Sequence, residues 1–384
     1  MRNLRERLST IAASEKKKTA PNPQEVSLYM EEHIFPLASL MEIEKSSLKE
    51  VLACDPYFIG KEWRLDDILF LDTETTGLSG GTGTYAFEVG VGIIEKGFFR
   101  VRQYVMRDYP QEKIMLLAIA ELLKTHKTLV SFNGKSFDIP LLESRMVVNG
   151  IHIQLSEIPH LDLMHVCRRI YKLRLKRCNL QTLERVVLGM QRLDDLPGAE
   201  APQRYFQYLR TGEFALLKDV LSHNLEDVVS LAKLTGHVAA VFRMPETLTE
   251  PEDLFSVGRV LERTGLIEQS RKCYRLLHHT TLEPSAKLHL AVSYKKAQNW
   301  DETITVCEDM IKEGQNGIWP YIEIAKYQEH VMKDYDSALA YATKGLSYLL
   351  NRLYTDKEKQ EAEISMTRKR IERLLRKQYI GRIV

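Results

Sequence analysis

Short strand-like segments and longer helix-like segments follow one another between residues 67 and 240, and their order limits the folds open to this chain. Alternating or continuous apolar runs predict strands at 67–72, 89–94, 98–105 and 128–132. Apolar residues at helical spacing predict helices at 114–124, 139–148, 163–171, 180–188 and 216–240. Three strands joined by short connections, followed by strands that alternate with helices, indicate a mixed sheet flanked by helices. We therefore predict an α/β domain over residues 62–244.

The pattern changes to continuous helix after residue 250, and a repeat becomes visible. Small or apolar residues recur 34 positions apart at Val257, Ala291 and Ala325, which is the period of tetratricopeptide repeats. Tyr335 follows Trp300 by 35 positions, so one residue is inserted in the third repeat. The spacing predicts an all-α, tetratricopeptide-like solenoid over residues 251–384 that ends in a basic C-terminal helix.

Two segments precede the α/β domain. Residues 1–25 are polar and basic and end in Pro-Asn-Pro, so we expect a flexible tail. Residues 26–61 carry apolar side chains at helical spacing, including Met30, Ile34 and Leu37, so we expect a helical lead-in. A chain of 384 residues is too long for one ordinary core, which agrees with separate domains.

The composition narrows the functional classes. The formal net charge is only +2, so a surface that binds nucleic acid must be local. The five cysteines include no Cys-x-x-Cys pair, so we expect reduced, mostly buried thiols and not a zinc or redox motif. The N-terminus lacks the apolar core of a signal peptide, and no apolar run approaches the length of a membrane span. We therefore expect a cytoplasmic protein without membrane insertion.

An acidic motif ends the first predicted strand. The apolar run at 69–71 leads into Asp72-Thr73-Glu74, and because side chains alternate along a strand, Asp72 and Glu74 point to the same face. Two carboxylates at the end of a hydrophobic strand repel each other and lose solvation, so they need a compensating cation. Mg²⁺ and Mn²⁺ prefer such oxygen ligands. Taken alone, the motif fits an ordinary polar turn equally well.

Two later motifs supply further candidates. Asp138 opens a predicted helix, where it is either a cation ligand or a simple N-cap. His223 and Asp227 are four positions apart and share one face of a helix, although such pairs are more often surface pairs. The three motifs together, Asp72 with Glu74, then Asp138, then His223 with Asp227, indicate a metal-dependent site. We expect two other acids to be structural: Asp162 as the cap of a following helix, and Glu88 as a support of the site strand.

In this combination the chain resembles the DEDD exonuclease superfamily, whose motifs are D-x-E, N-x-x-x-F-D, and Tyr or His before a last Asp. The matching residues are Asp72 with Glu74, Asn133 with Phe137 and Asp138, and His223 with Asp227. The glycine-rich segment 77–83 and the sequence at 223–227 also resemble the bacterial YprB-type ribonuclease-H-like proteins with tetratricopeptide C-termini. This resemblance covers about residues 60 to 240 closely and the repeats loosely. It implies a ribonuclease-H-like core followed by a tetratricopeptide-like solenoid.

The resemblance also implies a chemistry. The chain would hydrolyse phosphodiester bonds with two divalent cations, Mg²⁺ or Mn²⁺, as a 3′-to-5′ exonuclease on single-stranded nucleic acid. Asp72 would bridge both ions, Glu74 and Asp227 would complete the first site, and Asp138 would serve the second. His223 would accept a proton from the attacking water. His-type members usually have four residues between the histidine and the last aspartate, whereas this chain has three, so the assignment of the base stays open.

Two other classes of function stay open. One is a catalytically weak or inactive ribonuclease-H-like protein that binds nucleic acid without cutting it. The other is an adaptor whose repeats recruit a protein partner, because a fold does not establish an activity. The sequence also leaves open DNA against RNA, and exonuclease against endonuclease.

A basic run follows the acidic motifs in the predicted helix at 163–171 and just beyond it. Its cations either follow a phosphate backbone or form a solvated helix end that complements the helix dipole. The candidate nucleic-acid-binding residues are Arg168, Arg169, Lys172, Arg174, Lys176 and Arg177.

Overall fold

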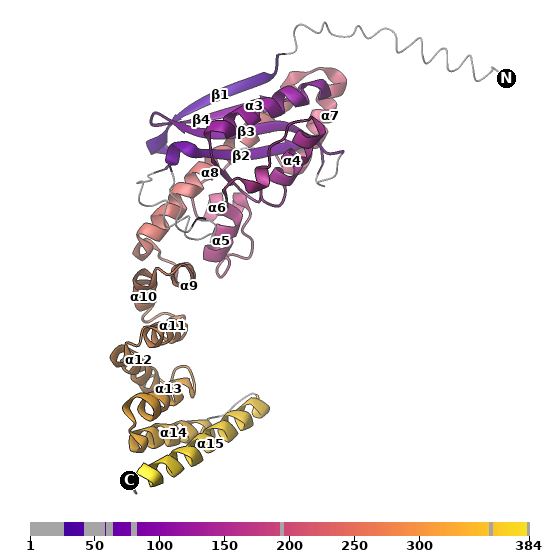
Figure 1. Cartoon of the computed structure of the whole chain (residues 1–384). Helices are drawn as coiled ribbons and strands as arrows, with labels where there is room; N and C mark the ends of the chain where they lie inside the picture. The colour runs from indigo at the N-terminus through magenta and orange to yellow at the C-terminus, as the bar shows by residue number, and fades with distance from the viewer. Residues whose placement is uncertain are drawn as a thin grey trace, which may run out of the picture. The chain divides into compact units, whose positions relative to one another are not determined.

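The computed structural model describes residues 27–41, 58, 64–77, 83–192, 196–352 and 356–381 (Figure 1). The expected tail at 1–25 and much of the expected lead-in lie outside these residues. The chain separates into two compact units, which we describe one at a time. The first comprises residues up to 42, 63–163 and 189–234, and the second comprises residues 43–62, 164–188 and 235–384.

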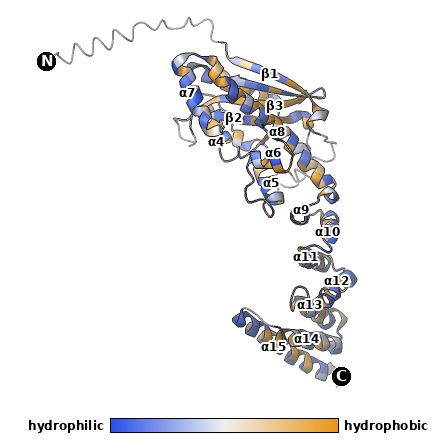
Figure 2. Cartoon of the chain, turned by 180° about the vertical axis from the view of Figure 1, so that it is seen from behind, coloured by the Kyte–Doolittle hydropathy of each residue, from blue (hydrophilic) through white to orange (hydrophobic). Residues whose placement is uncertain are grey.

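A six-stranded mixed sheet forms the centre of the first unit. Its spatial order is β1-β4-β3-β2-β5-β6. Strands β1, β4, β3 and β2 pair antiparallel, whereas β5 pairs parallel with β2, and β6 pairs parallel with β5. Figure 2 colours the central strands mostly as hydrophobic, in keeping with the buried residues of β2 and β3. The mixed sheet confirms the α/β prediction. The strands are β1 (Tyr29–Pro36), β2 (Ile68–Thr75), β3 (Ala86–Glu95), β4 (Phe98–Val105), β5 (Thr128–Ser131) and β6 (His160–Asp162).

Strand β1 shows that the prediction of a helical lead-in is wrong at this place. The segment pairs with β4 along its length, and its exposure alternates from residue to residue. Glu32 accepts hydrogen bonds from Arg100 at 3.0 Å and Arg102 at 2.8 Å on β4, which ties the edge strand to the sheet. Met30 and Ile34 misled the prediction because a spacing of four residues keeps two side chains on one face in a strand as well as in a helix.

Helices pack on the sheet of the first unit through their apolar residues, and one continuous core joins them to the strands. The sequence predicted these helices except α7. A buried ion pair between Arg145 and Glu112, 2.5 Å from Nε to Oε1, joins α4 to α3. The helices of this unit are α3 (Glu112–Thr125), α4 (Asp138–Val148), α7 (Ala201–Thr211) and, up to residue 234, α8 (Lys218–Arg243).

Two glycines of β3 set the distance between the sheet and α8. A Cβ atom at Gly90 would lie 2.0 Å from Oδ1 of Asn224, and one at Gly92 would lie 2.3 Å from Cζ of Phe99 on β4 and 3.0 Å from Cγ1 of Val228. Gly90 and Gly92 share one face of the strand, while Asn224 and Val228 are one turn apart on α8. The missing side chains therefore let α8 approach the strand closely and fix its register on the sheet.

The described part of the second unit is helical, and each helix from α9 to α15 contacts the next. The positions that repeat in the sequence, Val257, Ala291 and Ala325, are fully buried on α9, α11 and α13. A π-helical segment, Gln328–Met332, lies where the sequence indicated an inserted residue, and a π-turn accommodates one extra residue. The helices are α5 (Leu163–Tyr171), α6 (Leu180–Val186), α9 (Pro251–Arg263), α10 (Ile267–Arg275), α11 (Glu283–Lys296), α12 (Trp300–Lys312), α13 (Trp319–Tyr327), α14 (Tyr335–Leu350) and α15 (Lys357–Gly381).

The π-helical segment anchors the basic C-terminal helix through Glu329. The Glu329 side chain is fully buried and accepts hydrogen bonds from Arg370, Arg373 and Lys377 of α15, each at 2.8 Å. Burial alone would raise the pKa of Glu329, but the hydrogen bonds from Arg373 and Lys377 outweigh it and lower the pKa from 4.5 to about 2. Part of the basic character of α15 is therefore structural.

Two smaller expectations can be compared with the described residues. Within them, no helix combines the length and apolar character needed to cross a membrane. Cys167, Cys178, Cys273 and Cys307 are buried free thiols, as predicted, and Cys54 lies outside the described residues.

We expect Gly90→Ala to lower the free energy of unfolding by about 1–3 kcal/mol, because the added methyl group must push Asn224 away from the sheet. Urea denaturation followed by circular dichroism measures the change. Gly83→Ala is the control: its Cβ would meet no atom within 4 Å, so we expect a change under about 0.5 kcal/mol. If both variants match the wild type, the close approach of α8 does not depend on Gly90.

We expect Glu329→Gln to lower the free energy of unfolding by about 1–3 kcal/mol at neutral pH, because charge-assisted hydrogen bonds to α15 are lost. Because folding lowers the pKa of Glu329, its stabilising effect is present above pH 4.5 and is lost as the pH falls toward about 2. The difference between wild type and variant should therefore shrink over that range in urea denaturation. Glu372→Gln, at an exposed position of the same helix, is the control, and a pH-independent difference would contradict the account.

Candidate active site

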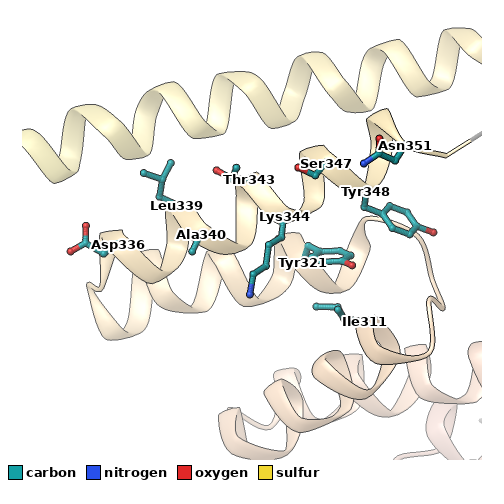
Figure 3. A pocket seen from close by; sticks show the side chains of 10 residues that line it. All are labelled: Ile311, Tyr321, Asp336, Leu339, Ala340, Thr343, Lys344, Ser347, Tyr348 and Asn351. Carbon is teal, nitrogen blue, oxygen red and sulfur yellow. The ribbon is translucent and has the colours of Figure 1, made fainter.

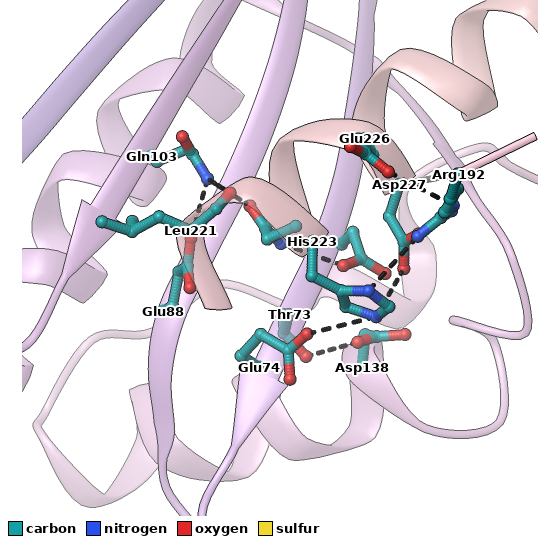
Figure 4. Close-up of polar contacts among 12 residues, drawn as sticks. Thr73, Glu74, Glu88, Gln103, Asp138, Arg192, Leu221, His223, Glu226 and Asp227 are labelled. Atoms are coloured by element: carbon teal, nitrogen blue, oxygen red, sulfur yellow. Dashed lines mark hydrogen bonds and ion pairs between the residues drawn. The ribbon is translucent and has the colours of Figure 1, made fainter. Parts of the chain in front are cut away.

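Five sequence-predicted side chains lie close together in the first unit, and Figure 4 labels four of them, Glu74, Asp138, His223 and Asp227. Asp72 and Glu74 come from β2, Asp138 is the first residue of α4, and His223 and Asp227 come from α8. His223 Nε2 lies 3.8 Å from Oε1 of Glu74 and 3.7 Å from Oδ2 of Asp227. The fold thus brings the end of β2, the start of α4 and one face of α8 together. We call Asp72, Glu74, Asp138 and Asp227, with the neighbouring His223, the acid cluster.

Asp138 does not act as the N-cap of α4, because Phe137 occupies that position. Instead, Oδ1 of Asp138 accepts a hydrogen bond from the hydroxyl group of Thr73 on β2. The side chain is 6% exposed. The contact ties the start of α4 to the strand that carries Asp72 and Glu74.

Asp162 has a structural role next to the acid cluster. Its two carboxylate oxygens accept hydrogen bonds from the backbone N–H groups of Asn133 at 2.9 Å and Lys135 at 3.2 Å. These bonds hold the loop between β5 and α4 that leads to Asp138. Asp162 therefore supports the position of Asp138, in addition to any role at the start of α5.

Burial and mutual repulsion raise the pKa values of three carboxyl groups of the acid cluster, Asp72, Glu74 and Asp138. Burial raises the pKa of Asp72, and the charges of Asp227, Asp138 and Glu74 raise it further. Burial and the charges of Glu88, Asp227 and Asp138 raise the pKa of Glu74 to about 9. Burial raises the pKa of Asp138 to about 6, although the hydrogen bond from Thr73 opposes this. The ionised cluster is thus unfavourable without a nearby cation.

A buried hydrogen-bond network that the sequence analysis missed holds Asp72 in place. Asn224 Nδ2 donates to Oδ2 of Asp72 at 2.9 Å, and Gln103 Nε2 donates to Oδ1 of Asn224 at 3.2 Å. Gln103 Nε2 also donates to Oε1 of Glu88 at 2.8 Å, and burial raises the pKa of Glu88 to about 8. The glycines of β3 were the available signal, because they mark where α8 and Asn224 approach the sheet.

The sequence analysis also missed Arg192, a cation that contacts the acid cluster. Its side chain is 7% exposed, and its Nη2 donates to Oδ1 of Asp227. Its Nη1 lies 3.2 Å from Nδ1 of His223, and its Nε lies 3.6 Å from Oε2 of Glu226 (Figure 4). No linear signal points to Arg192, because a lone arginine outside any motif has no characteristic spacing.

The donor set of the acid cluster fits divalent cations. Four carboxyl groups offer oxygen ligands of the kind that Mg²⁺ and Mn²⁺ prefer. Burial and nearby negative charges raise the pKa values of three of them, Asp72, Glu74 and Asp138, so a cation between them would be stabilising. A second group of candidate ligand atoms within 4.8 Å of one another lies at His278, His279 and Glu283.

The His278 group is less suited to a cation. Lys287 Nζ lies 3.0 Å from Oε1 of Glu283, and His278 Nδ1 lies 2.5 Å from the same oxygen. The ammonium group already compensates the carboxylate and would repel an added ion. We assign no metal to this group.

The candidate nucleic-acid-binding cations lie on α5 and in the turn after it, within the second unit. Arg174 is engaged in an ion pair, with its Nη2 2.6 Å from Oδ2 of Asp253. Lys172 Nζ donates to the backbone carbonyl of Lys176 at 2.7 Å. The other four, Arg168, Arg169, Lys176 and Arg177, have exposed side chains.

Comparison with known proteins identifies the first unit. Residues 69–239 match the model of the RNase_H superfamily, a range that contains the whole acid cluster. The chain is 32% identical over 295 residues to the uncharacterized protein YprB of Bacillus subtilis (strain 168), a match that covers 75% of this chain and 71% of that protein. The mixed sheet and its helices agree with that assignment. The chain therefore belongs to the YprB family of ribonuclease-H-like proteins.

Proposed function

We propose that this chain is a metal-dependent nuclease that hydrolyses phosphodiester bonds at the acid cluster. The supporting observation is the convergence of four carboxyl groups from β2, α4 and α8 in a site where burial and mutual repulsion raise the pKa values of Asp72, Glu74 and Asp138. Such a group of acids is stable in ionised form only with strong positive charge between its members. Membership of the RNase_H superfamily supports nuclease chemistry independently of that geometry.

The proposed mechanism assigns a task to each side chain of the acid cluster. Two divalent cations, Mg²⁺ or Mn²⁺, would activate the water and neutralise charge on the scissile phosphate. Asp72 would hold both ions, Glu74 and Asp227 the first, and Asp138 the second. Asn224 keeps the Asp72 carboxylate oriented through its hydrogen bond. His223, which faces Glu74 and Asp227 through Nε2, would take a proton from the attacking water.

The substrate side of the proposal is a single-stranded nucleic acid cut from its 3′ end, by likeness to the DEDD exonucleases. The exposed cations on α5 and in the turn after it would contact its phosphates; they are Arg168, Arg169, Lys176 and Arg177. Arg174 is the least suited of the six, because it is paired with Asp253. The successive helices of the second unit, with buried small or apolar residues 34 positions apart, favour a tetratricopeptide-like solenoid, a fold that offers an extended surface for a protein partner.

A second candidate function is an adaptor in which nucleic-acid cleavage plays no part. A groove of about 660 Å³ in the second unit favours it, because aromatic and apolar side chains line the groove and could receive a protein segment (Figure 3). Tyr321, Leu339 and Tyr348 are among the lining residues, together with Lys344. Hydrolysis of nucleic acid separates the two candidates.

We expect the wild type to shorten end-labelled oligonucleotides with Mg²⁺ or Mn²⁺ and to be silent with a chelator. Asp72→Asn should abolish this activity and leave the fold intact, because the amide keeps the shape but removes the negative charge. A panel of single- and double-stranded DNA and RNA, labelled at either end, reports the substrate and the polarity. Asp219→Asn, at an exposed acid of α8, is the control. Equal activity of Asp72→Asn and wild type would remove Asp72 from the mechanism.

We expect His223→Ala to lower the rate roughly a hundredfold or more, because a general base contributes about that much. Metal binding should be retained, since the carboxylates stay. Single-turnover rates with saturating Mn²⁺ measure the chemical step. A loss of less than about threefold would leave proton removal to other groups.

We expect replacement of Arg168, Lys176 and Arg177 by Gln to flatten the dependence of oligonucleotide affinity on salt, because each phosphate contact contributes to that slope. Fluorescence anisotropy at several salt concentrations measures it. Replacing Arg352 by Gln, in the turn after α14, is the control. An unchanged slope would favour a solvated helix end over a nucleic-acid contact.

A further inference from the structure

Arg192 inserts a positive charge beside two side chains to which the proposed mechanism gives tasks. One guanidinium group donates to Oδ1 of Asp227 and lies 3.2 Å from Nδ1 of His223, with Glu226 at 3.6 Å on its outer side (Figure 4). The side chain is 7% exposed. An arginine that is this buried, and held by carboxylates through a planar fork of donors, has a defined position.

The contact with His223 fixes the tautomer of the histidine. A guanidinium group has donors but no acceptor, so the contact at 3.2 Å is a hydrogen bond only when Nδ1 of His223 is unprotonated. A neutral imidazole then carries its proton on Nε2, the nitrogen that faces Glu74 at 3.8 Å and Asp227 at 3.7 Å. In this arrangement Nε2 carries a proton and is unable to accept one from water.

The contact with Asp227 competes with a bound cation. The carboxylate that accepts the hydrogen bond from Nη2 of Arg192, that of Asp227, is a metal ligand in the proposed mechanism. Arg192 thus supplies part of the missing positive charge and occupies one of the proposed ligands.

We propose that Arg192 is a positioning residue that holds the acid cluster in a resting state, and that a divalent cation displaces it. This inference rests on the proposed nuclease function. A displaced guanidinium group needs another anion, because a buried unpaired charge is costly. The substrate phosphate is the anion that the reaction brings, and it matches the two-pronged geometry of arginine. Metal loading and phosphate binding should therefore favour each other through Arg192.

Calorimetric titration of the full chain with Mn²⁺ tests the competition. We expect Arg192→Met to bind Mn²⁺ roughly tenfold or more tightly than the wild type, because a positive charge within a few ångströms of the ion is removed. Arg192→Lys keeps that charge and should stay within about threefold of the wild type. Arg204→Met, which removes an α7 cation that lies 3.9 Å from the exposed Asp219, is the matched control and should bind like the wild type.

Nitrogen NMR of histidine-labelled, metal-free protein tests the tautomer of His223 in the wild type itself. The resonances of His223 are assigned by their loss in His223→Gln. We expect an unprotonated Nδ1 and a protonated Nε2 in the metal-free wild type. Both resonances should shift when Mg²⁺ is added to fill the site; Mg²⁺ is used here because it is diamagnetic, unlike Mn²⁺. A protonated Nδ1 in the neutral imidazole would overturn the hydrogen bond from Arg192.

The outcomes separate this inference from the proposed function. If wild type and Arg192→Met bind Mn²⁺ with equal affinity, the metal site stands and the role of Arg192 is overturned. If Arg192→Met binds and the wild type does not, the inference is supported in its strongest form. If neither binds, both the inference and the metal-dependent function are overturned.

Discussion

The burial of mutually repelling carboxyl groups is the constraint on which the rest of this structure depends. Asp72, Glu74, Asp138 and Asp227 come from three separate elements, and the raised pKa values of Asp72, Glu74 and Asp138 show that burying these acids together opposes folding. The surrounding fold compensates with directed contacts, since Asn224 donates to Asp72, the Thr73 hydroxyl donates to Asp138, and Arg192 donates to Asp227. A site that is costly to assemble and short of positive charge is typical of function rather than of stability.

The position of the site follows from the packing of one helix on one strand. Gly90 and Gly92 remove the side chains that would keep α8 away from β3, and Asn224 fills the space over Gly90. His223 and Asp227 directly precede the two contact residues of α8, Asn224 and Val228, and are thereby directed to the end of β2. The geometry of the site therefore depends on two residues that have no side chain and take no part in any chemistry.

Much of this arrangement could be predicted from the sequence, and the failures have physical causes. The strands at 68–75 and 98–105 and the long helix α8 were predictable because their apolar periods are clear. Strand β1 was missed because Met30 and Ile34 fit a strand and a helix equally well. The four acids were found through short motifs, whereas Gln103 and Arg192 reach the site only through tertiary packing. The single inserted residue in the repeat indicated an irregularity before α14, where the π-helical segment lies.

The central claim is that the acid cluster exists to hold divalent cations, and anomalous diffraction from crystals grown in saturating Mn²⁺ tests it most directly. The account predicts an anomalous peak within about 2.2 Å of an Asp72 oxygen and of at least one other carboxylate of the cluster. It also predicts that the Arg192 guanidinium group moves away from Asp227. An ordered acid cluster with Arg192 still in contact with Asp227 and no anomalous peak between the carboxylates would contradict it.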